Sequence, residues 1–129
     1  HLERIRHADI FLDTFNVNAH TTCSDVLWSG VPVVTKVGEQ FAARVASSLL
    51  SALDIKELIT TSQEDYEKLI LELAVNKDKL LKIRKKIANN LSKTALFDTT
   101  KYTKAFESGL VIAYENNLNQ KDACDIKVT

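Results

Sequence analysis

Residues 8–35 are predicted to form a β-strand, a helix and a second β-strand, and this order of elements restricts the fold more than any other feature. The segment Ala8–Thr14 has a short apolar centre, which is typical of a strand buried on both faces of a parallel sheet. The segment Val31–Thr35 is β-branched, and its proline stands near its start, where a missing N–H matters least. Because such a unit makes a right-handed crossover, the sequence predicts an α/β fold with a parallel sheet flanked by helices.

The helix between the two strands is expected to begin at a threonine pair and to end near a glycine. Thr21 and Thr22 are good N-cap residues, and Asp25 suits the first turn. Gly30 is typical of the position just after a helix. We expect Trp28 on the apolar face of this helix, in the core.

The remainder of the chain is predicted to be mostly helical. The expected elements are a helix over Phe41–Leu53, a short and ambiguous strand over Ile55–Ile59, and helices beginning at Thr61 or Ser62, at Asn76 and at about Thr100. Residues 1–118 are then one lobe, and residues 119–129 form a polar tail. Two or three strands are few for a doubly wound sheet, so we expect further strands upstream of His1 in a longer protein.

The charge balance argues against two classes of partner. The 129 residues include 17 basic and 17 acidic side chains, which gives a formal net charge of zero. Capture of nucleic acid or of an acidic membrane needs an excess of Lys and Arg, so neither is expected. The basic cluster near residues 82–86 alternates with apolar residues and is interpreted as a solvated helix face. No apolar stretch could span a bilayer and no signal-peptide core is present, so we expect a cytoplasmic protein.

The cysteines and histidines do not follow a metal-binding spacing. Cys23 and Cys124 are expected to be free thiols. Cys23 stands at a helix N-terminus, where a lowered pKa is expected, but no third group completes a nucleophilic site. His7 is expected to be an ordinary exposed or packed helical residue.

The segment Asn18–Asp25 carries the chemistry that the sequence suggests. It lies where a parallel strand gives way to a helix, at the sheet edge that usually binds ligands in open α/β folds. The helix N-terminus offers N–H groups to a phosphate, and His20, Thr21 and Thr22 add side-chain donors. Asp25, about one turn later, can accept hydrogen bonds from ribose hydroxyls. No glycine-rich phosphate loop is present.

The same residues have a simpler interpretation. In this interpretation, Thr21 and Thr22 only cap the helix, and the ring N–H of His20 donates to a loop carbonyl. Residue chemistry alone leaves both interpretations open.

Several motifs resemble the C-terminal catalytic lobe of the O-linked N-acetylglucosamine transferases. The resemblance covers about residues 1–118, and its most specific part runs from Leu12 to Thr35. The matching strings include HLER at residues 1–4, ADIFLDT at 8–14, NAHTT at 18–22, DVLWSGVPVVT at 25–35, ARVASS at 43–48 and LFDT at 96–99.

This resemblance implies a GT-B architecture, in which this chain is part of the C-terminal Rossmann-like lobe that binds most of the donor. His20, Thr21 and Thr22 would then hold the diphosphate of a UDP-sugar, and Asp25 would meet the ribose. The resemblance assigns His1 to the uridine and the backbone near Arg4 to the uracil edge. No metal or other cofactor is implied.

The implied activity is transfer of N-acetylglucosamine, or a related sugar, to serine or threonine of acceptor proteins. Any catalytic base, the acceptor site and the tetratricopeptide repeats of such enzymes would lie upstream of His1, so this chain alone is expected to be inactive. Surfaces left open by truncation could pair two copies of the chain.

Two departures from the family pattern support an alternative function. Ala19 stands where many relatives have glycine, and residues 15–17 form a different loop. A non-catalytic regulatory or interaction module that keeps the lobe fold is therefore the second hypothesis. A sugar-nucleotide epimerase with the same two-lobe plan is a third, which the HTT string does not support.

Overall fold

The structure is a computed structural model that describes residues 1–128. The chain divides into two compact units, His1–Leu96 and a second unit that begins at Phe97.

The first unit is built on a parallel sheet with the strand order β1-β2-β3. Its strands are β1 (Phe11–Leu12), β2 (Val33–Lys36) and β3 (Ile59–Thr60). Phe11 pairs with Val33, and Thr35 pairs with Ile59, both in parallel register. The predicted parallel sheet is confirmed, and the ambiguous segment 55–59 ends in its third strand.

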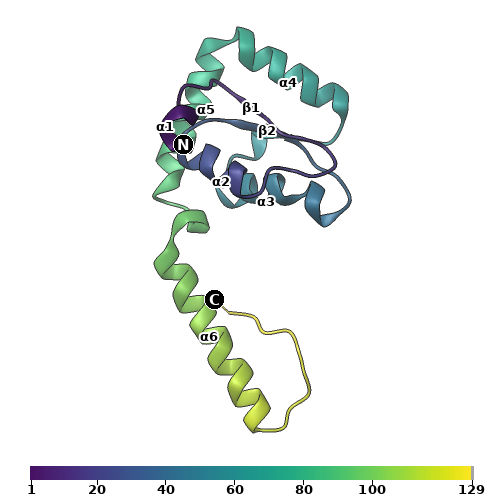
Figure 1. The fold of residues 1–129 in the computed structure, drawn as a ribbon, viewed down its shortest axis with the longest axis vertical. Coiled ribbons are helices and arrows are strands. Elements are labelled where there is room, and N and C mark those ends of the chain that lie inside the picture. Colours follow the sequence, from purple (N-terminus) through teal and green to yellow (C-terminus); the bar gives the residue numbers. More distant parts are fainter. Residues whose placement is uncertain (129) are drawn as a thin grey trace. The chain divides into compact units, whose positions relative to one another are not determined.

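Helices cover both faces of this sheet. They are α1 (Leu2–Ile5), α2 (Thr21–Trp28), α3 (Val45–Ala52), α4 (Gln63–Val75) and α5 (Lys77–Leu91), with short 3-10 turns η1 (Phe41–Ala43) and η2 (Lys56–Leu58). Figure 1 shows α2 and α3 on one face of the sheet and α4 on the other, where α5 packs against α4. This layering is that of an α/β domain.

The caps of α4 and α5 agree with the sequence. Ser62 caps α4, and its hydroxyl accepts a hydrogen bond from Asp65 N–H at 3.0 Å. Asn76 caps α5 and accepts from Lys79 N–H at 3.0 Å. Each cap satisfies an N–H group that the helix itself leaves free.

The core lies between the sheet and its helices. Its fully buried large side chains come from α2, β2, α3, the loop after α3, η2, α4 and α5, and they include Leu27, Val33, Val34, Leu50, Leu53, Ile55, Leu58, Leu73 and Ile87. The prediction that the first strand is buried on both faces is wrong, since Leu12 is 53% exposed. β1 is an edge strand of this sheet, and an edge strand is covered by fewer neighbours than a central one.

Trp28 does not lie in the core, contrary to the prediction. Trp28 is 50% exposed, whereas Cys23, Val26 and Leu27 are buried. Those three residues stand at i, i+3 and i+4 and define the inward face of α2. Trp28 comes one residue later and is rotated away from the core.

The predicted helix over residues 41–53 is interrupted. η1 ends at Ala43 and α3 starts at Val45, because Arg44 leaves helical geometry with φ −126° and ψ −5°. The turn closes on Gly38, whose N–H donates to the carbonyl of Ala43 at 2.8 Å. A Cβ atom at Gly38 would lie 2.6 Å from the Cβ of Ala43, so only glycine fits this close approach.

The second unit consists mainly of one long helix. α6 (Thr99–Leu118) follows the short turn η3 (Ala95–Phe97), and the side chain of Asp98 caps it by accepting from Lys101 N–H at 2.9 Å. Tyr102 and Phe106 stack with their ring centroids 6.1 Å apart. Residues 121–128 form neither helix nor strand.

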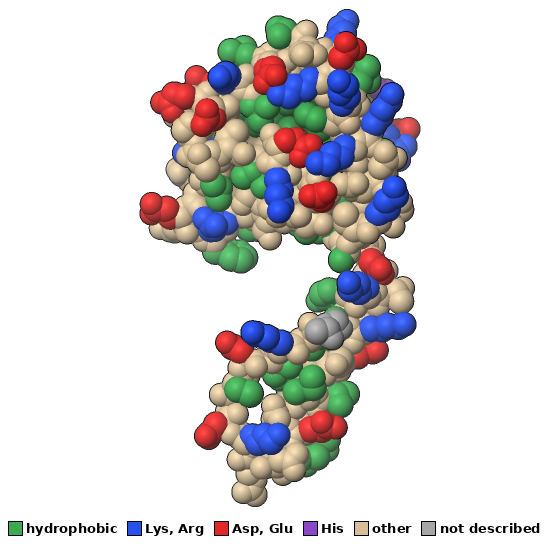
Figure 2. Space-filling view, turned by 180° about the vertical axis from the view of Figure 1, so that it is seen from behind, with side chains coloured by type: hydrophobic (Ala, Val, Ile, Leu, Met, Phe, Trp, Pro, Cys, Tyr) green, Lys and Arg blue, Asp and Glu red, His purple; other side chains and the backbone are tan. Residues whose placement is uncertain are grey.

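Charged side chains of both signs are mixed over the face of the larger unit that Figure 2 shows. In the basic cluster, Lys86 Nζ lies 2.9 Å from Glu57, and Arg84 Nη1 lies 3.9 Å from Asp9. Opposite charges therefore accompany part of this cluster, as expected for a solvated helix face. Among the described residues, no helix is both long and apolar enough to cross a membrane.

Candidate functional site

The start of α2 follows the loop that leaves the carboxyl end of β1. We call this start, formed by His20, Thr21 and Thr22, the HTT turn. His20 is the N-cap residue, and no side chain of residues 1–128 makes a capping hydrogen bond there. The interpretation of the threonines as caps is therefore wrong. Both lie inside the first helical turn, exposed, with no hydrogen bond from their hydroxyls to the described part of the chain.

The backbone of the HTT turn also offers hydrogen-bond donors. The first α-helical bond of α2 runs from Ser24 N–H to the carbonyl of His20 at 3.2 Å. The N–H groups that precede Ser24 in the helix have no acceptor within it, and they carry the positive end of the helix dipole. Exposed hydroxyls beside these N–H groups form an arrangement that suits an anion.

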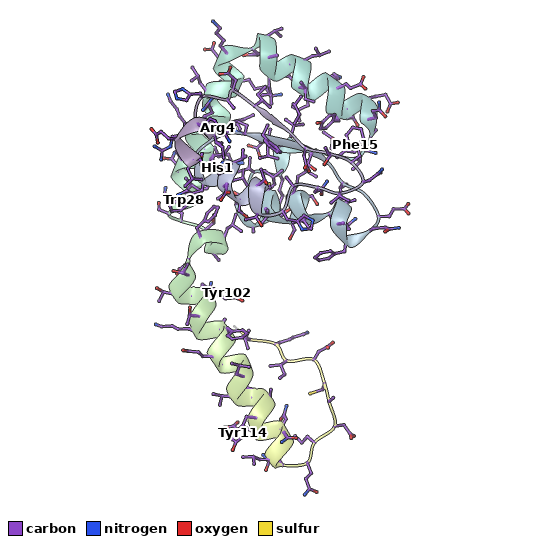
Figure 3. All side chains as sticks on the ribbon, in the orientation of Figure 1. His1, Arg4, Phe15, Trp28, Tyr102 and Tyr114 are labelled. Carbon is purple, nitrogen blue, oxygen red and sulfur yellow. The ribbon has the colours of Figure 1, made fainter. Side chains whose placement is uncertain are left out.

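Two further predicted site residues meet beside this turn. The Nε2 atom of His1 lies 3.7 Å from Oδ2 of Asp25, and both side chains are partly exposed. Arg4 lies in α1, which begins directly after His1, and its side chain is exposed; Figure 3 labels both residues. The carbonyl of Arg4 accepts a hydrogen bond from His7 N–H at 3.3 Å. The fold thus brings His1 to Asp25, and Arg4 lies in the short helix that follows His1.

Phe41 borders the HTT turn, and the sequence did not single it out. Its ring packs edge-on against the imidazole of His20, with centroids 6.2 Å apart and an interplanar angle of 87°. Phe41 is nevertheless 81% exposed, whereas Ala43 in the same turn is buried. An apolar position at the start of a predicted helix carried no signal for this role.

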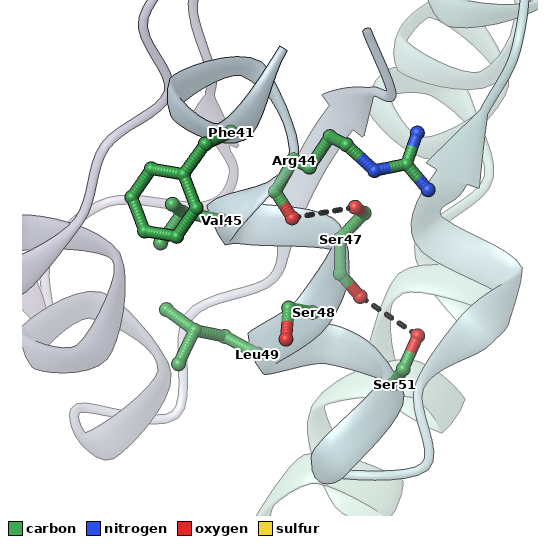
Figure 4. A pocket seen from close by; sticks show the side chains of 7 residues that line it. All are labelled: Phe41, Arg44, Val45, Ser47, Ser48, Leu49 and Ser51. Atoms are coloured by element: carbon green, nitrogen blue, oxygen red, sulfur yellow. Dashed lines mark hydrogen bonds between the residues drawn. The ribbon is translucent and has the colours of Figure 1, made fainter. Parts of the chain in front are cut away.

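An open pocket extends from Phe41 along α3. Figure 4 shows its lining residues Phe41, Arg44, Val45, Ser47, Ser48, Leu49 and Ser51. The hydroxyl of Ser47 donates to the carbonyl of Arg44 at 2.8 Å, and that of Ser51 donates to the carbonyl of Ser47 at 2.7 Å. Two of its hydroxyls are therefore committed to the helix backbone. The pocket contains no predicted site residue and touches the HTT turn only through Phe41.

Cys23 is not an activated thiol, and the expected lowering of its pKa is wrong. The side chain is fully buried. Burial, followed by the nearby negative charge of Asp13, raises the pKa of Cys23 from 9.0 to about 12. The loss of hydration and a neighbouring anion outweigh the helix N-terminus. Cys23 and Cys124 are both free, as predicted.

Two buried polar residues anchor the loop before the HTT turn, and the sequence analysis missed both. Asn18 donates from Nδ2 to the carbonyl of Thr14 at 2.7 Å, and its N–H donates to the carbonyl of Ala42 at 2.8 Å. Asp13 accepts the N–H of Ala19 at 2.7 Å. An Asp that closes a strand and an Asn in a loop are common, so their types alone gave no signal. Within residues 1–128, no cluster of three or more His, Cys, Asp or Glu could hold a metal ion.

Comparisons with known proteins show which family the chain resembles. The sequence model of glycosyl transferase family 41 matches residues 1–106. A UDP-N-acetylglucosamine–peptide N-acetylglucosaminyltransferase of Caenorhabditis elegans is 35% identical over an alignment of 128 residues that covers 91% of this chain and 11% of that protein. A probable enzyme of the same name, SEC of Arabidopsis thaliana, is 42% identical over 108 residues, or 83% of this chain and 11% of the relative.

A solved structure agrees with these sequence matches. An O-GlcNAc transferase mutant of Thermobaculum terrenum superposes with a TM-score of 0.76 and 33% sequence identity. The match covers 83% of this chain and 21% of that one. The chain therefore has the fold of a part of that transferase, and it spans about a tenth of the length of the two sequence relatives.

Proposed function

Because this chain belongs to glycosyl transferase family 41, we propose that it forms the nucleotide-sugar binding part of a UDP-sugar-dependent glycosyltransferase. The enzyme transfers N-acetylglucosamine, or a related sugar, from a UDP donor to serine or threonine of acceptor proteins. Both named relatives are peptide N-acetylglucosaminyltransferases, which supports this choice of donor and acceptor.

The proposal rests on the hydrogen-bond donors of the HTT turn that α2 itself leaves unpaired. Thr21 and Thr22 are exposed, they do not cap α2, and they adjoin the free N–H groups of its first turn. The diphosphate of UDP would accept hydrogen bonds from these groups and from His20. Asp25 would bind the ribose, and His1 with the backbone near Arg4 would lie beside the uracil.

The role of these residues in transfer is to stabilise the leaving group. The oxygen of the acceptor hydroxyl attacks the anomeric carbon, and the bond from that carbon to the β-phosphate oxygen breaks. UDP departs with the bonding electrons, while the hydroxyl proton passes to a base that lies outside this chain. Helix N–H groups and hydroxyls that meet the growing negative charge lower the barrier. No metal or other cofactor is part of this scheme.

The proposal extends to the organisation of the protein. Residues 1–118 form the donor-binding lobe, residues 119–129 form a tail, and the acceptor is bound by other regions of a longer cytoplasmic enzyme. This chain alone binds UDP weakly and does not transfer sugar. Apolar side chains exposed on α4, such as Leu71 and Val75, can pair two copies of the isolated chain.

A transfer assay on the full-length gene product tests the proposal. Sugar-labelled UDP-N-acetylglucosamine is supplied with acceptor protein, and the double variant Thr21→Val, Thr22→Val is compared with the parent. Loss of the two hydroxyl hydrogen bonds to the charged diphosphate should reduce transfer by about a hundredfold. Transfer by the double variant at the parental rate would remove the HTT turn from the mechanism.

The chain contains its own matched control. Thr99 and Thr100 are an exposed threonine pair in the first turn of α6. The double variant Thr99→Val, Thr100→Val should keep full transfer. A parent that neither transfers nor hydrolyses the donor would instead favour the non-catalytic interaction module, which the replacement of a glycine by Ala19 motivates.

A further inference from the structure

We propose that Asp13 is a positioning residue that pre-forms the HTT turn for the diphosphate by holding the backbone of Ala19. This inference rests on the proposed function, because it names what shapes the same site. Asp13 does not contact the nucleotide; it acts through the loop.

Asp13 connects the end of β1 to three other parts of the fold. Its side chain is 3% exposed, and Oδ1 accepts the N–H of Ala19 at 2.7 Å. Oδ2 accepts the hydroxyl of Thr35, at the end of β2, at 2.7 Å. The backbone carbonyl of Asp13 accepts the hydroxyl of Tyr66 from α4 at 2.9 Å. The carboxylate thus ties the residue immediately before His20 to the sheet.

The carboxylate of Asp13 is buried among hydrogen-bond donors, close to Cys23 and Tyr66. Its negative charge, after burial, is a cause of the raised pKa of both Cys23 and Tyr66. Cys23 lies in the first turn of α2, so the carboxylate is near the positive end of that helix. Burying a carboxylate costs free energy unless hydrogen-bond donors surround it. Apolar side chains at the end of β1 would give the fold as much stability. The two short hydrogen bonds from Ala19 and Thr35 hold the loop in one conformation.

The alternative is that Asp13 serves only overall stability. In that case, its removal would weaken every ligand contact of the lobe to the same extent. If Asp13 shapes the HTT turn, its removal should weaken the binding of the diphosphate and spare the nucleoside. Uridine lacks both phosphates and reports on the contacts of His1, Arg4 and Asp25, so the ratio of UDP affinity to uridine affinity separates the two roles.

The experiment is calorimetric titration of UDP and of uridine into the full-length gene product. Asp13→Ala should weaken UDP by about tenfold and leave uridine unchanged, since it removes a charge-assisted acceptor from Ala19. Asp13→Asn should bind UDP at least as tightly as the parent. The amide oxygen can still accept from Ala19, Thr35 can accept from the amide nitrogen, and a negative charge near the diphosphate is removed.

Tyr66→Phe is the matched control, because it removes a bond to Asp13 without touching the carboxylate. It should lower the melting temperature and keep the parental ratio of UDP to uridine affinity. Equal losses of UDP and uridine in Asp13→Ala, or an Asp13→Asn variant as weak as Asp13→Ala, would overturn the inference.

The remaining outcomes are decisive as well. If Asp13→Ala does not fold, Asp13→Ser replaces it, since a serine is too short to reach Ala19 and should show the same selective loss. If neither variant folds, Asp13 is a residue of overall stability and the inference is wrong. If Thr22→Val weakens UDP binding while Asp13→Ala leaves it intact, only this inference fails. If both leave it intact, the proposed function fails too.

Discussion

The imidazole of His1 lies 3.7 Å from the carboxylate of Asp25, although the whole of β1 and its loop separates them in the sequence. This contact joins α1 to α2 just beyond the HTT turn. A residue proposed for the uridine therefore lies beside the residue proposed for the ribose. The two residues are close because α1 packs against α2.

Asp25→Asn should weaken UDP and uridine by similar factors. The ribose is common to both ligands, and the amide of Asn has one acceptor oxygen where the carboxylate has two, so a loss of about fivefold to tenfold is expected for each. Calorimetric titration of the full-length gene product measures both. Asp122→Asn, in the exposed tail, is the control and should change neither. A loss confined to UDP would assign Asp25 to the phosphates instead.

Cys23 should make the protein less stable at high pH. Its folded-state pKa, raised from 9.0 to about 12, exceeds the unfolded value, so the folded state holds the thiol proton more tightly. This stabilisation is fully present below pH 9 and is lost as the pH rises towards 12. Chemical denaturation at pH 7 and pH 10 should show a smaller decrease in Cys23→Ala than in the parent. An identical decrease in both proteins would show that Cys23 is accessible to water.

Gly38→Ala should destabilise the chain by about 1–3 kcal/mol, because the added methyl group overlaps Ala43. The clash distance is 2.6 Å, and the opposing atom is a Cβ that cannot rotate away. Gly109→Ala is the matched control: its nearest atom is 3.5 Å away, and alanine favours the middle of α6 by about 0.5–1 kcal/mol. Denaturant titration should therefore give opposite signs for the two variants.

Leu50→Ala should cost about 2–5 kcal/mol of unfolding free energy, since Leu50 is fully buried and its truncation leaves a cavity. Phe41→Ala should change stability by less than about 0.5 kcal/mol, because the ring is mostly in solvent. The same denaturant titration measures both. A large loss of stability in Phe41→Ala would mean that the exposed ring is part of the core in solution.

The features that the sequence predicted well depend on local patterns. Ser62 and Asn76 cap helices because their side chains accept from an N–H three residues ahead. Such a contact depends only on neighbouring residues, so the sequence alone can predict it. The βαβ unit follows from two apolar runs around one helix. Gly30 adopts φ +80° just after α2, as a glycine at a helix end often does.

The features that it missed depend on packing between distant segments. Trp28 lies next to two buried residues, but the rotation of α2 on the sheet turns it outward. The raised pKa of Cys23 depends first on burial in the core and then on Asp13, ten positions earlier, and no local rule predicts either. Phe41 and His20 meet only because η1 folds back towards the start of α2. Only tertiary contacts explain how the candidate site is shaped.

The central claim is that the HTT turn receives the diphosphate, and the structure of the full-length gene product with UDP tests it most directly. We predict phosphate oxygens within hydrogen-bonding distance of the N–H groups and hydroxyls of Thr21 and Thr22, with the ribose at Asp25. A saturated complex in which the diphosphate lies elsewhere, with the start of α2 in contact with solvent alone, would contradict the account.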